Sequence, residues 1–172
     1  MTYKDELIKA MKMLAEEDNV IFLGQEADSY YRTMTDIPKE KIRVMPVVED
    51  AQMGMSTGLS LVGFLPVSLF TRMDFFLLAF NQLINHLDKI EEMCEGEFRP
   101  KVIIRVAIGE TKPLDPGPQH TQDFTDFLKN TLKNIDIICL NNSKDIVPSY
   151  KKALKSNKSS ILIEKRDLYG SD

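Results

Sequence analysis

Short runs of β-branched and apolar residues alternate along the chain with segments whose apolar residues recur at helical spacing. The apolar runs predict strands at residues 20–24, 41–45, 64–70, 101–108, 135–140 and 160–164. The helical spacings predict helices at residues 2–17, 50–61, 74–92, 123–132 and 145–155, the first capped by Thr2 and the third by Asp74. Apolar strands that alternate with helices are typical of a parallel sheet covered on both sides. We therefore expect an α/β fold, a three-layer sandwich with a mostly parallel central sheet and helices on both faces.

The length of the chain fits a single domain over residues 1–172. A chain of this size can bury about 70% of the surface that it exposes when unfolded. Apolar residues make up 43% and charged residues 28%, ordinary values for a globular protein that argue against a mostly disordered chain.

Charge and cysteine usage exclude several classes of function. Lys and Arg number 22 against 26 for Asp and Glu, and a net charge of -4 is a poor basis for binding nucleic acid. The longest apolar run, residues 75–80, is too short to span a membrane, and the N-terminus has no apolar signal core. Cys94 and Cys139 form no metal-binding motif. We expect a cytoplasmic protein without a metal site of its own.

Glu49 is a candidate for chemistry because it follows apolar residues and opens a predicted helix. An acid there is more often explained by the helix dipole alone, but two features favour a functional role. Gly54 and Gly58 share one face of the helix, and each costs about 1 kcal/mol relative to Ala, which indicates a closely approaching ligand or backbone. Residues 46–48 are apolar, so desolvation would raise the pKa of the Glu49 carboxyl and favour its proton-donating form.

The two histidines have different surroundings. His120 lies between a Gly- and Pro-rich loop and a predicted helix, so it either caps that helix at the surface or serves as an acid, base or hydrogen-bonding group at the ligand end of the sheet. His86 lies within the predicted helix at residues 74–92, and we expect it to be packed. That helix is apolar around much of its circumference, which predicts burial or an oligomer interface. Phosphate-binding motifs such as GxGxxG and the P-loop are absent.

Four stretches, taken in their order and spacing, resemble the pyrimidine-binding domain of transketolase-like thiamine diphosphate enzymes, above all the beta subunits of 2-oxo acid dehydrogenases. They are residues 46–58, 74–86, 119–122 and 161–170. The resemblance implies that Glu49 bonds to the aminopyrimidine ring of thiamine diphosphate and stabilises its imino tautomer. It also implies that Phe75 packs near this ring and that His120 faces the substrate.

The chain departs from that family at three places. It stops near residue 172, where beta subunits continue into a further C-terminal domain. Arg72 stands where the family often has an aromatic residue that stacks on the pyrimidine. Its guanidinium could stack or bind an anionic substrate, so we count Arg72 with Glu49 and Phe75 among the cofactor-binding residues. Gln25 replaces an acid that is common in the family.

In the family, a second domain holds the diphosphate and Mg²⁺. The resemblance therefore implies a split enzyme, with the cofactor at the interface to a separate diphosphate-binding subunit and with two copies of each subunit in a heterotetramer. Transketolase-like transfer from a ketose and decarboxylation or dehydrogenation of a 2-oxo acid both fit, and the chain alone would be inactive. The alternatives are a non-catalytic assembly or regulatory subunit, which Arg72 favours, and an unrelated flavodoxin-like binding module.

Overall fold

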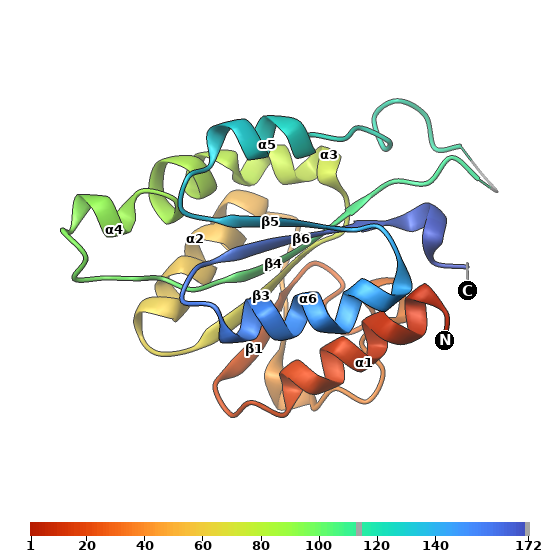
Figure 1. The fold of residues 1–172 in the computed structure, drawn as a ribbon, viewed down its shortest axis with the longest axis horizontal. Helices are drawn as coiled ribbons and strands as arrows, with labels where there is room; N and C mark the ends of the chain where they lie inside the picture. Colours follow the sequence, from red (N-terminus) through yellow and green to blue (C-terminus); the bar gives the residue numbers. More distant parts are fainter. Residues whose placement is uncertain (113–114, 171–172) are drawn as a thin grey trace.

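The computed structural model describes residues 1–112 and 115–170, whose strands form one six-stranded sheet (Figure 1). The strands lie in the order β2-β1-β3-β4-β6-β5, and all of these neighbouring pairs are parallel. The sheet consists of β1 (Val20–Gly24), β2 (Ile42–Val44), β3 (Leu65–Phe70), β4 (Ile103–Ile108), β5 (Asp136–Leu140) and β6 (Ser160–Lys165). The predicted α/β class and parallel sheet are confirmed.

Helices cover both faces of the sheet, as the apolar strands predict (Figure 1). The helices α1 (Tyr3–Ala15) and α6 (Ser143–Lys155) cover one face, over a hydrophobic core that includes Phe22. On the other face lie α2 (Glu49–Leu61), α3 (Met73–Phe76) and α5 (Thr125–Thr131), over a second core that includes Phe76. Outside the segment of residues 73–93, three further 3₁₀ turns have too few residues to show a period in the sequence: η1 (Tyr30–Arg32), η2 (Lys39–Lys41) and η5 (Arg166–Leu168).

The start of α1 follows the sequence prediction. Thr2 is the N-cap, and its Oγ1 accepts a hydrogen bond from the Asp5 main-chain N–H at 3.1 Å. The Asp5 carboxylate in turn accepts from the Thr2 N–H at 3.0 Å. This capping box satisfies two main-chain donors that the first turn of a helix leaves without partners.

The single long helix predicted at residues 74–92 is wrong. The segment consists of α3, a 3₁₀ turn η3 (Leu77–Ala79), the π-helical η4 (Asn81–Leu87) and α4 (Ile90–Met93). Asp74 does not cap this segment, because Arg72 occupies the N-cap position. The buried Asp74 carboxylate instead accepts hydrogen bonds from Gln122.

The expected packing of His86 is also wrong, because its side chain is exposed. In the π-helical stretch Leu83 and Leu87 are fully or almost fully buried, whereas His86 lies on the solvent side. The 3₁₀ turn η3 is wound more tightly than an α-helix and the π-helical η4 more widely, so the rotation per residue changes along the segment. A period of 3.6 residues therefore does not predict correctly which side chains are buried here. Leu77 and Leu78 are 41% and 62% exposed, so this segment is not buried around its whole circumference.

The sheet topology defines where a ligand would be expected. The chain moves from β1 outward to β2 and then crosses back to β3 on the other side of β1. In open parallel sheets, ligands bind beyond the carboxyl ends of the strands at such a switch point. Among the described residues, no helix is long and apolar enough to cross a membrane.

Candidate functional site

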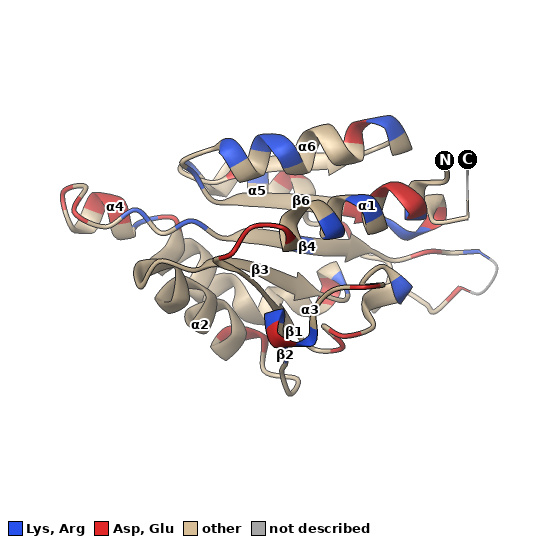
Figure 2. Cartoon of the chain, turned by 90° about the horizontal axis from the view of Figure 1, so that it is seen from below, with Lys and Arg blue, Asp and Glu red and all other residues tan. Residues whose placement is uncertain are grey.

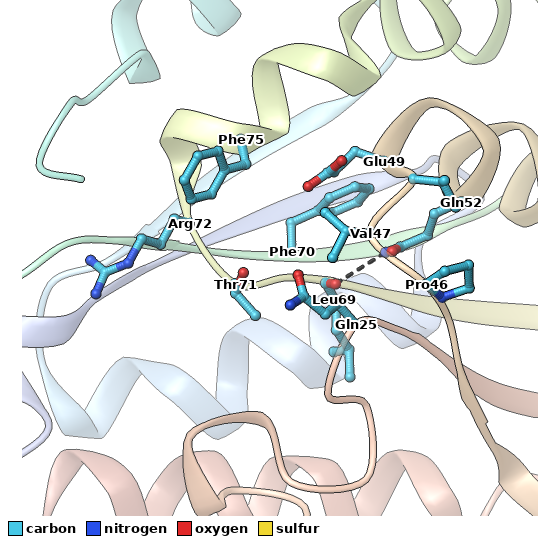
Figure 3. Close-up of a pocket in the computed structure, with 11 residues that line it drawn as sticks. Gln25, Pro46, Val47, Glu49, Gln52, Leu69, Phe70, Thr71, Arg72 and Phe75 are labelled. Atoms are coloured by element: carbon cyan, nitrogen blue, oxygen red, sulfur yellow. Dashed lines mark hydrogen bonds between the residues drawn. The ribbon is translucent and has the colours of Figure 1, made fainter. Parts of the chain in front are cut away.

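A crevice opens at this switch point, beyond the carboxyl ends of β1, β2 and β3 (Figure 3). Its walls come from the last residues of β3, from the residues that follow the three strands and from the first turns of α2 and α3. The lining residues are Gln25, Pro46, Val47, Val48, Glu49, Gln52, Leu69, Phe70, Thr71, Arg72 and Phe75. Three of the four predicted site residues, Glu49, Arg72 and Phe75, therefore lie at one crevice.

Glu49 is the first residue of α2, and its carboxylate points across the crevice toward Phe75 (Figure 3). The side chain is half-buried. Of the apolar residues that precede it, Val47 is 62% and Val48 41% exposed, so both remain in contact with solvent in the chain by itself. Water would be excluded from around Glu49 only if another molecule covered these two side chains.

Gln52 holds α2 against the sheet, a role that the sequence analysis did not identify. Its buried Nε2 donates to Ser68 Oγ and to the Leu69 carbonyl, each at 3.0 Å. Gly24 makes room for this contact, because a Cβ at Gly24 would lie 2.4 Å from the Leu69 carbonyl oxygen. A polar residue at a core-facing position of a predicted helix is the sequence signal that could have pointed to Gln52.

Phe75 connects the crevice to the loop that carries His120. Its ring lines the crevice near Glu49 and also lies edge to face with the His120 imidazole, at 5.4 Å between ring centroids. The two predicted catalytic residues, Glu49 and His120, thus lie on either side of Phe75. His120 itself does not line the crevice.

His120 is half-buried, and its Nδ1 is buried without a hydrogen-bond partner among the described residues. It does not cap α5, the other possibility that the sequence left open. Phe124 occupies the N-cap position, and the Asp123 carboxylate beside it accepts the Thr125 main-chain N–H at 2.9 Å. The imidazole is therefore available for an interaction that the described residues do not provide.

Arg72 lies at the crevice, but its guanidinium points away from Glu49 (Figure 3). Its Nη1 donates to the main-chain carbonyl of His120 at 3.1 Å. In this conformation the guanidinium does not lie across the crevice, where a stacking partner for a pyrimidine would be.

The two glycines of α2 have different neighbours. A Cβ at Gly54 would meet the Gln82 side chain at 3.5 Å, an ordinary contact distance. Gly58 has nothing within 4 Å of such a Cβ. No described residue therefore makes the close approach to Gly58 that we expected from the sequence.

The chemistry of the crevice suits the pyrimidine end of thiamine diphosphate. A carboxylate, an aromatic ring and apolar walls can bind a flat heterocycle that has a hydrogen-bonding edge. Among the described residues, no group of three or more His, Cys, Asp or Glu side chains could hold a metal ion. These residues therefore fit the ring but provide no comparable site for Mg²⁺.

Comparisons with known proteins agree with this geometry. No family model matches the chain. It is similar to the mitochondrial pyruvate dehydrogenase E1 component subunit beta of Caenorhabditis elegans, with 24% identity over 99% of this chain and 50% of the relative. The chloroplastic subunit beta-3 of Arabidopsis thaliana is 30% identical over 95% of this chain and 42% of the relative. The chain spans about half the length of these curated relatives.

Solved structures share the fold. A split gene transketolase, described as an inactive beta4 tetramer, has a TM-score of 0.76 at 19% identity over 96% of this chain and 51% of the other. Transketolase from Campylobacter jejuni has a TM-score of 0.78 at 14% identity over 96% of this chain and 26% of the other. The resemblance seen in the sequence is confirmed: the chain has a transketolase-like fold and is homologous to part of the pyruvate dehydrogenase E1 beta subunits.

Proposed function

We propose that this chain is the pyrimidine-binding subunit of a thiamine diphosphate-dependent enzyme that is divided between two polypeptides. The observation that carries the proposal is the position of Glu49, whose carboxylate lies in the crevice at the sheet's switch point and points toward Phe75. The homology to E1 beta subunits and the transketolase-like fold support the same class of enzyme.

Each site residue has a role that its chemistry permits. When bound, thiamine diphosphate supplies a carbon nucleophile for attack on a carbonyl group. Glu49 would hold a proton at a ring nitrogen of the pyrimidine, and Phe75 would provide an apolar wall for the ring. His120, on the other side of Phe75, would hold or move a proton at an oxygen of the substrate.

The surface around the crevice supports a partner subunit. Val47 and Val48 are exposed beside Glu49, and Met55 is 48% exposed on α2. The only charged residues of α2 are Glu49 and Asp50 in its first turn (Figure 2). A helix that has no charge beyond its first turn and has exposed apolar residues is typical of a surface that another protein covers. Such a partner would desolvate Glu49 and would supply the site for the diphosphate and Mg²⁺.

The assembly and the substrate are further parts of this proposal. Two copies of each subunit would form a heterotetramer, by analogy with symmetric oligomers in general. Transfer from a ketose and decarboxylation or dehydrogenation of a 2-oxo acid both remain candidates, because the similar proteins include a transketolase and pyruvate dehydrogenase subunits.

The test compares two neighbouring acids in the complex with a co-expressed diphosphate-binding subunit. We expect Glu49→Gln to lower turnover of a ketose or 2-oxo acid by roughly 100-fold or more, the scale of acid–base contributions. Asp50→Asn is the matched control, since Asp50 is exposed in the same helical turn but does not line the crevice. Thiamine diphosphate binding is measured by calorimetry on the chain alone and on the complex.

Unchanged turnover in Glu49→Gln would contradict the role of this carboxyl. A complex that assembles but neither binds thiamine diphosphate nor turns over either substrate class would instead favour the alternative, a non-catalytic assembly or regulatory subunit.

A further inference from the structure

Two segments far apart in the sequence, residues 72–75 and 120–122, are tied together beside the crevice. Arg72 Nη1 donates to the His120 carbonyl at 3.1 Å. Two residues further along, Asp74 Oδ1 accepts hydrogen bonds from both the main-chain N–H and the side-chain Nε2 of Gln122, each at 3.1 Å. These contacts place the His120 ring edge to face with Phe75.

The residue that follows β4 lies against this contact. Gly109 follows β4 directly and is buried. A Cβ at Gly109 would lie 1.8 Å from the His120 carbonyl oxygen and 2.7 Å from Arg72 Nη1. A side chain at Gly109 would therefore require the His120 main chain to move. Because Gly109 has no side chain, the His120 carbonyl and the Arg72 guanidinium can both lie close to it.

The hydrogen bond from Arg72 uses only the main chain of His120. The imidazole keeps its own hydrogen-bonding capacity, because Nδ1 is buried and has no partner among the described residues. Hydrogen bonds from a charged donor are about twice as strong as those between neutral groups. Arg72 can thus fix the place of the ring without occupying either ring nitrogen.

We propose that Arg72 is a positioning residue for His120, which it holds beside Phe75 by binding the His120 carbonyl against Gly109. The catalytic consequence rests on the proposed function, in which His120 serves the substrate. This role replaces the expectation from the sequence that the guanidinium binds the cofactor.

The test follows the two histidines of the chain by NMR. The ring of Phe75 displaces the imidazole signals of His120 through its ring current, whereas exposed His86 provides an internal reference in the same spectrum. We expect Arg72→Met to shift the His120 signals toward those of His86 and to leave the His86 signals unchanged. Arg72→Lys, which keeps a charged donor, should restore a large part of the native shift.

Arg43→Met is the matched control, because Arg43 also donates to main-chain carbonyls, those of Glu40 and Ile42, but lies on β2 and does not line the crevice. Thermal unfolding and far-UV circular dichroism verify that each variant is folded. In the active complex, we expect Arg72→Met to lower kcat by about 10- to 100-fold, because misplacing a catalytic group by 1 Å has effects of this size. The affinity for thiamine diphosphate should not change.

Native His120 signals in folded Arg72→Met would overturn the proposal. Weaker thiamine diphosphate binding with native His120 signals would do so as well, because it would make Arg72 a cofactor ligand. Shifted His120 signals support it, and do so even if no complex shows turnover, a result that would count against the proposed function alone.

Discussion

Arg105 and Glu164 form an ion pair that is fully buried between the neighbouring strands β4 and β6. The guanidinium donates twice, from Nε to Oε1 at 2.5 Å and from Nη2 to Oε2 at 3.0 Å. The hydroxyls of Tyr150 and Tyr169 also donate to the Glu164 carboxylate. Burying two charges is costly, so the pair depends on these hydrogen bonds to compensate for lost hydration.

We expect Arg105→Met to lower the free energy of unfolding by about 3–5 kcal/mol, because Glu164 would remain as a buried charge without its partner. Urea unfolding followed by circular dichroism measures the change. The double variant with Glu164→Gln should recover part of the loss, since a neutral amide can still accept from the tyrosines. A loss of under about 1 kcal/mol in the single variant would show that a buried Glu164 without its Arg105 partner does not destabilise the fold.

At the scale of elements, α2 is predicted to within one residue, whereas the helix predicted at 74–92 is interrupted. The difference lies in what the two segments contact. Among the buried polar side chains of α2, Gln52 donates a hydrogen bond to β3, and Ser56 and Thr57 donate to main-chain carbonyls within the helix. In the interrupted segment, the buried carboxylates of Asp74 and Asp88 accept main-chain N–H groups from the distant residues 122, 133 and 134. No local period can reveal such contacts.

Gly24→Ala tests how α2 is held on the sheet. Gly24 has a φ of +154°, and an added Cβ would press on the Leu69 carbonyl that accepts from Gln52. We expect the free energy of unfolding to fall by about 1–3 kcal/mol, the usual effect of overpacking a core. Gly58→Ala is the control, because its Cβ would meet open space within a helix and should be neutral or stabilising. Equal destabilisation by both variants would contradict this explanation.

At the scale of the whole molecule, all five tyrosines have a raised pKa, and burial is the main cause for each. The carboxylate of Glu164 adds to the effect, because a tyrosinate near it would be repelled. Unfolded tyrosine titrates near pH 10. A raised pKa in the folded state therefore contributes stability that is present below pH 10 and is lost as the pH rises above it.

We expect the folded protein to show little tyrosinate absorbance at 295 nm in the pH range near 10, where the chain in guanidinium chloride should titrate. Above that range, the absorbance should rise together with the loss of circular dichroism, because ionisation then accompanies unfolding. A smooth titration near pH 10 in the folded protein would contradict the burial of these side chains.

The candidate site was predicted in part. Glu49 and Phe75 lie at one crevice, as the motif order implies, and the structure brings His120 to the other side of Phe75. The packing of His86 was not predicted correctly, and the exposure of Val47 and Val48 and the hydrogen bond of Arg72 to the His120 carbonyl were not predicted at all. Each of these depends on neighbours from other elements, or on a partner, rather than on adjacent residues.

The amino-acid sequence was enough to establish the α/β class, most of the helical and extended segments and the identity of the candidate side chains, because apolar periods and motif order are properties of neighbouring positions along the chain. The hydrogen bond of Arg72 to the His120 carbonyl and the pairing of Arg105 with Glu164 emerge only in the folded chain. These partners are 48 and 59 residues apart. They meet because a parallel sheet places distant segments of the chain side by side, a relation that no local pattern records.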